Sequence, residues 1–351
     1  MKNRILILLL MFAFLISCFD NDKKYIVHQN LESIRKPISW GHEQKIYVVC
    51  DEELWNSVNN DLRESLSRKV MTTELEPFFD IERIDFEYFE DFYKFKNLLF
   101  LGNIESKSPV SIYLQELLNE NDLAEVREDK GKLFVKTNLW ANDQYIMFVM
   151  GDSNKIVDKI VNSQKEKIFK LYENRFRKRL EFQAYKTQVH PKSIFDDMIF
   201  SLPIPENFRL FRDKTNENFL SFLSRLGNHP DKYISVYFEE LEEEDFDKNW
   251  VKETRQKLSW KYYDEDFFED EKVKIEKYRL GNQPDGYKLW GLWQNKKYIV
   301  GGTFQSFAFY DKKHKSAILI DNSVYFPPGY KLKALVELEE ISKNIKIKEK
   351  K

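Results

Sequence analysis

The sequence has little cysteine, glycine and proline, and almost no net charge. Two cysteines in 351 residues exclude a disulfide-stabilised scaffold, and 11 glycines and 10 prolines exclude a collagen-like or linker-like chain. A formal charge of −2 lacks the strong basic bias of nucleic-acid-binding proteins. We therefore expect no nucleic-acid partner.

Motifs for metal or nucleotide chemistry are missing as well. The five histidines are scattered, and none stands in the HxH, HExxH or paired Cys–His spacings that hold zinc. The sequence contains no glycine-rich phosphate loop of the GxGxxG or Walker type. We expect no metal and no cofactor, and these absences favour a protein that is not an enzyme.

Aromatic and charged residues are abundant instead. Hydrophobic residues make up 42% of the chain and charged residues 32%, and 29 phenylalanines with 18 tyrosines supply a large core. A chain of 351 residues is long enough for two domains of about 100–200 residues each. The composition is typical of a folded globular protein.

The N-terminus has the layout of a secretion signal. Two basic residues precede an apolar run over residues 5–16, which is shorter than the roughly 20 residues of a membrane-spanning helix. The run ends in LISC at residues 15–18, which resembles the lipidation box of bacterial lipoproteins. The resemblance implies a signal peptide over residues 1–17 and acyl chains such as palmitate on Cys18. The alternatives are an uncleaved signal and an ordinary buried helix.

An acylated Cys18 would place the protein on a membrane of the cell envelope. Several acyl chains anchor strongly together, since each buried CH₂ contributes about 0.8 kcal/mol. Residues 18–43 follow as a polar tether of mixed charge. We expect an outer-membrane lipoprotein whose anchor makes the membrane a partner. Asp20 and Asp22 lie close behind the cysteine, where acids influence sorting, and the leaflet stays open.

Residues 44–188 predict a layered α/β domain. Short runs rich in Val, Ile, Leu and Phe alternate with amphipathic segments, as expected where strands alternate with helices. The clearest helix is expected directly behind Asp51, because apolar residues recur at every fourth position from Leu54 to Leu66. A second, long helical pattern runs from residue 153 to about 186.

Residues 192–346 predict a domain of a different type. Pro191 breaks the long helical pattern. Strand-like runs with short polar turns then dominate, with one helix expected near 246–263 and another from about residue 332. We expect an antiparallel sheet packed with helices, followed by a disordered tail at 347–351. The fold class of the whole chain is therefore mixed, with an α/β unit followed by an α+β unit.

Short motifs along the chain resemble those of a known family. They are, in order, YVVCDEELWNS, LWANDQYIM, SLPIPENFRLF, LWGLW, GGTFQSF and NSVYFPP. Together they are similar to a family of bacterial lipoproteins of unknown function from outer-membrane-type envelopes, over roughly residues 40–346. The resemblance implies no catalytic or binding residues. In its order of elements, the second half is also similar to small α–β–α sandwich domains such as the extrinsic subunits of photosystem II.

Four aromatic residues of the strand-rich part form a candidate binding face. Phe307 and Phe309 share one face of their expected strand, and Trp290 and Trp293 lie on the strand before it. Such residues either pack in the core or present an open groove to a glycan or a partner. The sequence leaves both interpretations open.

Cys50 is the candidate nucleophile of a rival interpretation, an envelope hydrolase. A helix that begins just after it would lower the pKa of the thiol, whereas the acids at positions 51–53 would raise that pKa. A catalytic Cys50 should be exposed within hydrogen-bond reach of a histidine. The other interpretation is a small buried apolar residue that closes a strand. Acidic clusters at residues 239–247 and 264–271 are interpreted as solvated loops.

The functional expectation is a lipid-anchored envelope protein of unknown biochemical activity that acts in binding or assembly. An envelope protein is the expected partner besides the membrane. One alternative is a hydrolase that uses Cys50 or an acidic pair. Another is a glycan- or peptide-binding module that uses the strand aromatics.

Overall fold

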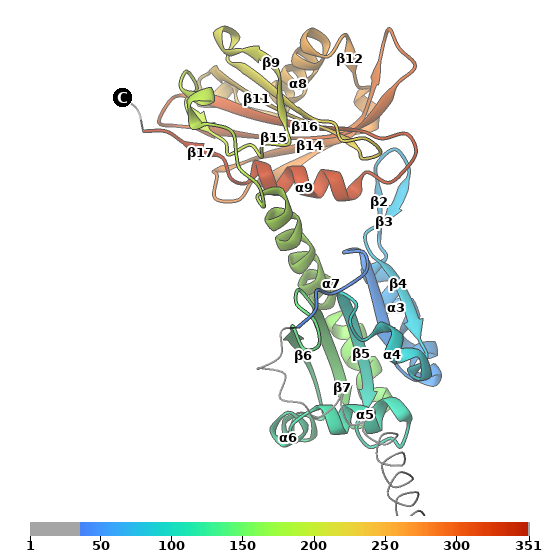
Figure 1. Cartoon of the computed structure of the whole chain (residues 1–351). Helices are drawn as coiled ribbons and strands as arrows, with labels where there is room; N and C mark the ends of the chain where they lie inside the picture. The colour runs from blue at the N-terminus through green and yellow to red at the C-terminus, as the bar shows by residue number, and fades with distance from the viewer. Residues whose placement is uncertain (1–35, 350–351) are drawn as a thin grey trace, which may run out of the picture. The chain divides into compact units, whose positions relative to one another are not determined.

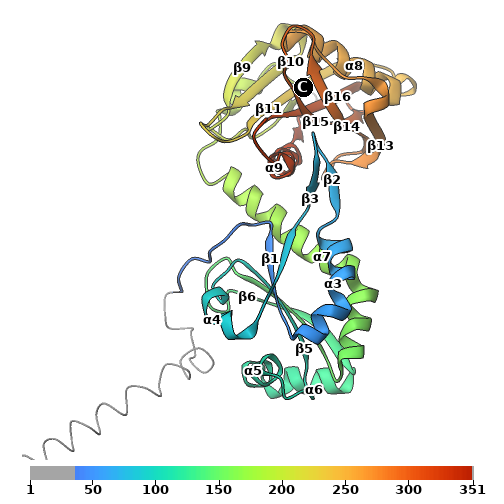
Figure 2. The same ribbon diagram turned by 90° about the vertical axis from the view of Figure 1, so that its right-hand side faces the viewer.

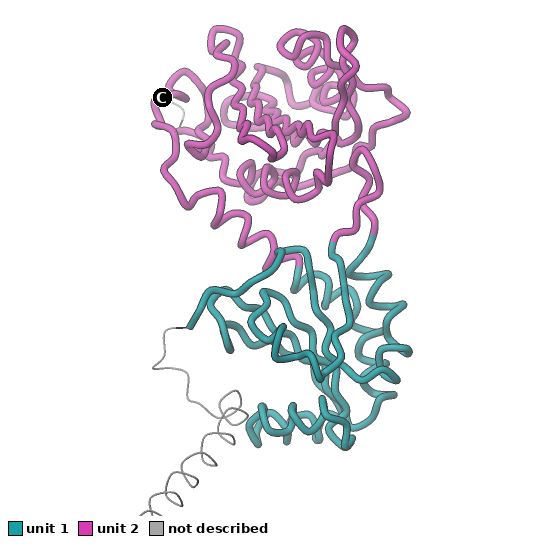
Figure 3. The backbone as a smooth tube through the Cα atoms, turned by 45° about the vertical axis from the view of Figure 1, so that its right-hand side comes forward, with its two compact units in different colours: residues 1–68, 79–172 teal, residues 69–78, 173–351 magenta. Residues whose placement is uncertain are grey.

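The computed structural model describes residues 36–349, which divide between two compact units (Figure 3). Unit 1 contains the described residues up to 68 together with residues 79–172, and unit 2 contains residues 69–78 and those from 173 onward. The lipidation box at 15–18 lies outside the described residues. Within residues 36–349, no helix is both long enough and apolar enough to span a bilayer.

Unit 1 is built on a mixed sheet with the strand order β4-β1-β5-β7-β6. Four strands run parallel, and β6 pairs antiparallel with β7 at one edge. Every residue of β7 and nearly every residue of β5 is buried, which explains why their sequences are continuous apolar runs. The strands are Lys45–Val49 (β1), Asp80–Ile84 (β4), Asn97–Asn103 (β5), Gly131–Thr137 (β6) and Tyr145–Gly151 (β7).

Helices pack on both faces of this sheet (Figure 2). On one face, α3 (Glu52–Leu66) lies beside the first part of α7 (Asn154–Ala184), where the Ser65 hydroxyl donates to the Lys165 carbonyl oxygen at 2.7 Å. The helices predicted behind Asp51 and from residue 153 are thereby confirmed. The other face packs through one apolar cluster against three short helices, which are Phe89–Phe92 (α4), Pro109–Leu117 (α5) and Glu120–Glu128 (α6).

Unit 2 contains an antiparallel sheet of eight strands in the order β12-β14-β15-β16-β11-β10-β9, with β13 also paired to β14. The longest strands lie in its centre, where each is paired along its whole length. The strands are Arg209–Lys214 (β9), Phe219–Ser224 (β10), Asp231–Glu240 (β11), Asp266–Phe267 (β12), Val273–Arg279 (β13), Asp285–Asn295 (β14), Gly301–Asp311 (β15) and Ser316–Tyr325 (β16).

One helix covers each face of this sheet (Figure 1). Helix α8 (Lys248–Tyr262) packs on the face that carries Phe304, and α9 (Leu332–Ser342) packs on the face that carries Phe307. Alternate residues of β15 thus enter two separate cores, as the period of two in a strand requires. The mixed α and β content expected for the chain is confirmed.

Two further small strand pairs complete unit 2. Strand β8 (Phe200–Ser201) pairs with β17 (Lys346–Ile347), and Lys348 N–H donates to the Ile199 carbonyl oxygen at 2.9 Å. The tail expected to be disordered from residue 347 therefore begins in a strand, because its backbone finds partners along β8. Residues 350–351 lie outside the described residues.

The hairpin of β2 (Lys69–Met71) and β3 (Leu75–Pro77) belongs to unit 2, although the sequence on both sides of it belongs to unit 1. Its Glu76 contacts the start of α9. The residues of α7 from 173 onward also belong to unit 2. The structural division therefore differs from a simple boundary near residues 188–192.

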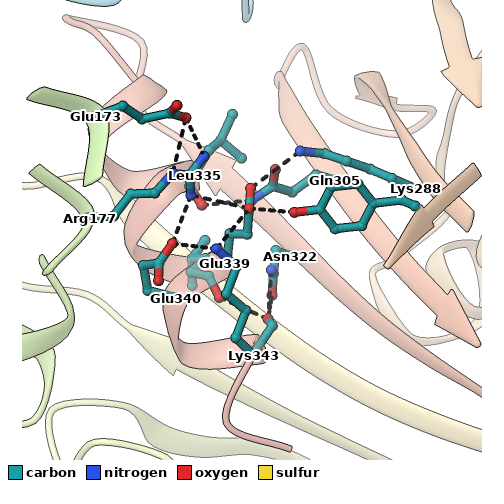
Figure 4. A network of polar contacts seen from close by, with 12 residues as sticks. Glu173, Arg177, Lys288, Gln305, Asn322, Leu335, Glu339, Glu340 and Lys343 are labelled. Carbon is teal, nitrogen blue, oxygen red and sulfur yellow. Dashed lines mark hydrogen bonds and ion pairs between the residues drawn. The ribbon is translucent and has the colours of Figure 1, made fainter. Parts of the chain in front are cut away.

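A buried ionic network holds α9 against α7 and the sheet (Figure 4). Arg177 of α7 places Nη1 3.1 Å from a carboxylate oxygen of Glu339 and 2.7 Å from one of Glu340. Lys288 of β14 and Lys343 approach the Glu339 carboxylate at 3.3 and 3.4 Å. Burial alone would raise the pKa of Glu339, but these cations lower it to about 2.

Candidate functional site

A pocket of about 220 Å³ lies on the α8 side of the unit 2 sheet. Its lining comes from strands β9, β11, β12, β14 and β16, from α8 and from the turn that follows α8. The volume is below the roughly 300–1,000 Å³ of sites for drug-sized molecules, so the pocket fits a compact ligand. The lining residues that matter for its chemistry are Phe211, Tyr233, Arg255, Asp266, Trp293 and Tyr325.

Arg255 is the buried cation of the pocket. Its side chain is 2% exposed, its Nε lies 3.4 Å from Asp321 Oδ1, and its guanidinium stacks on the Phe304 ring at 3.8 Å. Within residues 36–349 neither Nη nitrogen donates a hydrogen bond, and Nη1 is fully buried. A buried donor without an acceptor costs about 1–3 kcal/mol, and Nη1 has less than 1 Å² of exposed surface, so this cost is part of the folded structure itself.

Trp293 contributes a second buried donor. Its side chain is 8% exposed, and its indole Nε1 has no hydrogen-bond partner among the described residues. The indole lies against Gly302, where an added Cβ would come 2.8 Å from Nε1. Glycine at position 302 is therefore what allows the indole to pack so closely against the neighbouring strand.

Three aromatic rings form a wall of the pocket. The ring centroids of Phe211 and Tyr263 lie 6.1 Å apart with nearly parallel planes, and Tyr233 stands edge-on to both. The Tyr263 hydroxyl is hydrogen-bonded to Ser221 and Ser235 across the sheet. Burial raises the pKa of Tyr263, so the phenol stays neutral and the wall is fixed in place.

Asp266 gives the pocket a carboxyl group that is a weaker acid than usual. Burial raises the pKa of Asp266 to about 6, against the hydrogen bond that Asn295 Nδ2 donates to its Oδ1 at 2.7 Å. The same amide donates to the Asp264 carbonyl oxygen at 2.9 Å. Asn295 therefore fixes the turn after α8 to the end of β14.

The turn itself is strained at the pocket rim. Asp264 and Glu265 have φ values of 53° and 74°, a region that side-chain-bearing residues rarely adopt. Strain of this kind costs about 1–3 kcal/mol per residue and is concentrated at binding and catalytic sites. Asn218 and Lys315 of unit 2 also have positive φ and do not line this pocket, so the conformation is a feature of the rim and not unique to it.

The structure brings one of the four predicted aromatic residues to the pocket. Trp293 lines it, whereas Trp290 is half-buried elsewhere on β14. Phe307 and Phe309 are 0% and 1% exposed in the core beneath α9, which corresponds to the core interpretation of the two that the sequence left open. The reason is that α8 and α9 cover both faces of the sheet, which the strand pattern alone does not reveal.

Cys50 is a core residue. It is 1% exposed, and burial raises the pKa of its thiol to about 12. A thiol of this kind is neither accessible nor ionised near neutral pH, so the geometry gives no support to a cysteine nucleophile. Cys18 lies outside the described residues. Within residues 36–349 no three His, Cys, Asp or Glu side chains are grouped so that they could hold a metal.

Sequence reasoning missed Arg255 and Asp266. The sequence predicts a helix near 246–263, and in the structure Arg255 lies among the buried residues of that helix, such as Val251 and Leu258. Asp266 stood in an acidic cluster interpreted as a solvated loop. A lone arginine among buried helix positions is the signal that could have identified the site.

Two family models match the chain. Residues 39–184 match the domain of unknown function DUF8532, and residues 186–344 match the domain of unknown function DUF4837. The search of curated proteins found no match.

Solved structures with some likeness include a yeast and a mycobacterial protein. The Ran-binding protein Mog1p of Saccharomyces cerevisiae is 13% identical with a TM-score of 0.29, over 42% of this chain and 90% of that chain. LpqN of Mycobacterium tuberculosis, described as involved in cell envelope biogenesis, is 13% identical with a TM-score of 0.26, over 42% of this chain and 82% of that chain. Two successive parts of the chain are thus similar to two domains of unknown function.

Proposed function

We propose that this chain is a bacterial lipoprotein of the cell envelope, anchored at the outer membrane through Cys18, whose unit 2 binds a small ligand without catalysing a reaction. The LISC sequence at residues 15–18 and the polar tether behind it support the anchor. The pocket of unit 2 supports the binding role.

One observation carries the binding role. The pocket encloses a guanidinium, that of Arg255, which is almost fully buried and whose Nη groups have no acceptor within residues 36–349. Asp321 and the Phe304 ring hold this group in position. A preformed pocket with a few fixed polar groups and aromatic walls is the usual form of a small-molecule site.

A ligand screen on the full chain tests this role. Saturation-transfer NMR with a library of compact polar compounds is expected to yield binders that Arg255→Lys weakens, because lysine keeps the charge beside Asp321 but loses the Nη groups. Lys257→Arg, on the same helix but outside this pocket, is the matched control. A library without any binder, or binders that Arg255→Lys leaves unchanged, would contradict the proposal.

The anchor is tested separately. The chain is expressed in a bacterium that processes lipoproteins, and an alkyne-tagged palmitate is supplied during growth. The wild type should incorporate the label and fractionate with the outer membrane, whereas Cys18→Ala should do neither. Cys50→Ala is the control that should keep both properties. Label on the Cys18→Ala variant would refute lipidation at this position.

A binding protein of the envelope is also expected to meet a protein partner. Gentle detergent extraction followed by affinity capture of the tagged chain would recover such a partner. Recovery of the bare monomer alone would count against an assembly role, while the pocket would remain to be tested by the ligand screen.

The hydrolase that uses an acidic pair is a second candidate. The observation in its favour is Asp266, whose pKa is raised to about 6 beside Asp264 at the pocket, a state suited to a general acid. If it is correct, the ligands found in the screen should be cleaved over hours, and Asp266→Asn should abolish cleavage while binding persists. Intact ligands with wild-type protein would exclude this candidate.

A further inference from the structure

A hairpin tip of unit 2 holds apolar side chains out in solvent. The turn between β14 and β15 carries Tyr298, which is 60% exposed, and Ile299, which is fully exposed at 108%. The Asn295 side chain fixes this turn, because its Oδ1 accepts hydrogen bonds from the N–H groups of Lys297 and Tyr298, both at 2.8 Å. The exposure of Ile299 is therefore built into a turn of defined geometry.

A second hairpin tip lies beside the first. Thr73, in the turn between β2 and β3, lines a hollow of about 600 Å³ together with Tyr298 and Ile299. Met71 and Leu75 stand on either side of this second turn and are 56% and 58% exposed. They pair directly across the hairpin, so their side chains lie on the same face of it. Two turns from distant parts of the sequence thus expose apolar side chains at one place on unit 2.

An exposed tryptophan and lysines extend this region along α8. Trp260 is 41% exposed, and the Lys296 ammonium lies 5.1 Å from the centroid of its ring. Lys257, one helix turn earlier, lines a second hollow with Trp260. Lys297 is paired with Glu265 at 2.9 Å, whereas Lys257 and Lys296 form no ion pair within residues 36–349. The hairpin surface is defined as these lysines together with the exposed apolar residues Met71, Leu75, Trp260, Tyr298 and Ile299.

The size of the hairpin surface disfavours a protein partner. Stable protein–protein interfaces cover about 800 Å² on each partner and involve roughly 20–30 residues a side. The hairpin surface offers five exposed apolar side chains, which stand at the ends of two hairpins and on one helix. This arrangement is too sparse for an interface of that kind.

The composition of the hairpin surface suits the interface of a lipid bilayer. Tryptophan and tyrosine favour the level of the headgroups, where one part of the ring is apolar and the other is wet. Aliphatic side chains such as Ile299 and Leu75 can enter the acyl boundary, while lysines keep their ammonium groups at the phosphates. Asp264 lines the same pocket as Tyr298 and offsets part of the positive charge, so the apolar side chains should carry most of the binding.

We propose that unit 2 docks on a phospholipid bilayer through the hairpin surface, with Tyr298 and Ile299 entering the bilayer. A contact made by so few apolar side chains is weak and reversible by itself. The anchor proposed at Cys18 would hold the chain near a bilayer and raise the effective concentration of this contact. The choice of a bilayer rests in part on that anchor, whereas the experiment below does not use it.

A fluorophore that brightens in apolar surroundings reports the depth of single positions. Ile299→Cys is labelled with nitrobenzoxadiazole in a full chain that carries Cys18→Ala, where the buried Cys50 is the other thiol. Lys312→Cys places the label in the turn at the opposite end of β15, and Phe182→Cys places it at an apolar position of α7 that is 71% exposed. Vesicles of phosphatidylcholine, alone or mixed with phosphatidylglycerol, are then added.

The readout is local depth, because the apolar run at residues 5–16 could bring the chain to a vesicle by itself. We expect the label at 299 to brighten severalfold with both kinds of vesicle and to become shielded from iodide in the water. The labels at 312 and 182 should stay unchanged. Lys296→Gln should raise the lipid concentration for half of the change at 299 about fivefold with phosphatidylglycerol present, and not with phosphatidylcholine alone.

An unchanged label at 299 in the presence of vesicles would overturn the proposal, and the palmitate experiment would still decide the anchor separately. Equal brightening at 182 would show that any exposed apolar side chain adsorbs, which also overturns it. Brightening at 299 without lipid would do the same. At high concentration of the chain, it would mean that a second copy covers the hairpin surface. After addition of a detergent-free extract of envelope proteins, it would mean that a protein partner does.

Discussion

The carboxylate of Glu76 accepts hydrogen bonds at 2.8 Å from the backbone N–H groups of Lys331 and Leu332, which lie 255 and 256 residues further along the chain. These groups form the first turn of α9, and the Lys331 side chain makes no capping hydrogen bond there. A hairpin distant in sequence thus supplies the N-terminal cap of α9, and its negative charge is favourable at that end of the helix dipole.

Removal of this cap should destabilise unit 2. Glu76→Ala leaves two buried N–H groups without acceptors and should lower the free energy of unfolding by about 2 kcal/mol or more. Glu76→Gln keeps one acceptor and should cost less. Glu74→Ala, an exposed acid on the same hairpin, is the control. If urea titrations give Glu74→Ala and Glu76→Ala the same free energy of unfolding, the cap contributes nothing to stability.

Glu339 should make the protein sensitive to acid. Its folded pKa of about 2 lies below the ordinary value of 4.5, so its contribution to stability is complete above about pH 4.5 and is lost as the pH falls toward 2. Glu339→Gln should cost about 3 kcal/mol at pH 7, because it leaves the buried Arg177 and Lys288 partly uncompensated. The difference from wild type in the free energy of unfolding should shrink as the pH falls. A constant difference between pH 7 and pH 3 would contradict this.

Asp266 should affect the pH dependence of the free energy of unfolding in the opposite direction from Glu339. Its folded pKa of about 6 lies above the ordinary value of 3.8, so the free energy of unfolding should fall as the pH rises from about 4 to about 6, and stay lower above that. Asp266→Asn removes the titrating group and should therefore be more stable than wild type at pH 7 and equal to it below pH 4. Thermal unfolding across this range measures the difference. Asp264→Asn should not reproduce the pH profile.

Cys50 should be inert in the folded protein. In a Cys18→Ala background it is the last thiol of the chain, and with a pKa of about 12 and 1% exposure it should resist iodoacetamide at pH 8. The same thiol should be alkylated completely after denaturation. Mass spectrometry counts the adducts. Rapid alkylation of the native chain would instead support Cys50 as an accessible nucleophile.

A fragment limited to residues 186–344 should fold poorly. It spans the match to one domain of unknown function, yet it lacks Glu76 and Arg177, which cap α9 and balance its buried carboxylates. Circular dichroism and hydrogen exchange should show a frayed α9 in this fragment, while the full chain protects it. Equal protection of α9 in both would mean that these two residues are dispensable.

Much of the fold could be predicted from local pattern. The helix behind Asp51 follows from apolar residues at every fourth position, and β5 and β7 follow from runs of Leu, Phe, Ile and Val. The β2–β3 hairpin could not be assigned to unit 2, because its partner Leu332 is far away in sequence. Burial of Phe307 depends likewise on α9, which local periodicity does not place.

The pocket could be predicted from the sequence only in small part. Phe211, Arg255 and Trp293 come from three separate elements, and the pairing of the strands together with the packing of α8 on the sheet brings them together. Trp293 was singled out for its residue type, whereas Arg255 resembles any surface arginine of a helix until its burial is known. The raised pKa of Asp266 is equally a product of its surroundings, since the same residue in a solvated loop would titrate normally.

The uninterrupted helix α7 has a consequence for how the two halves of this protein can change over generations. Recombination at residue 185, between the two family matches, would deliver a second half whose α9 depends on residues encoded upstream of the junction. Positions 76, 177 and 339 should therefore co-vary among relatives. A lineage that loses the carboxylate at 339 should also replace the arginine at 177. The two halves should therefore be inherited together and not exchanged separately.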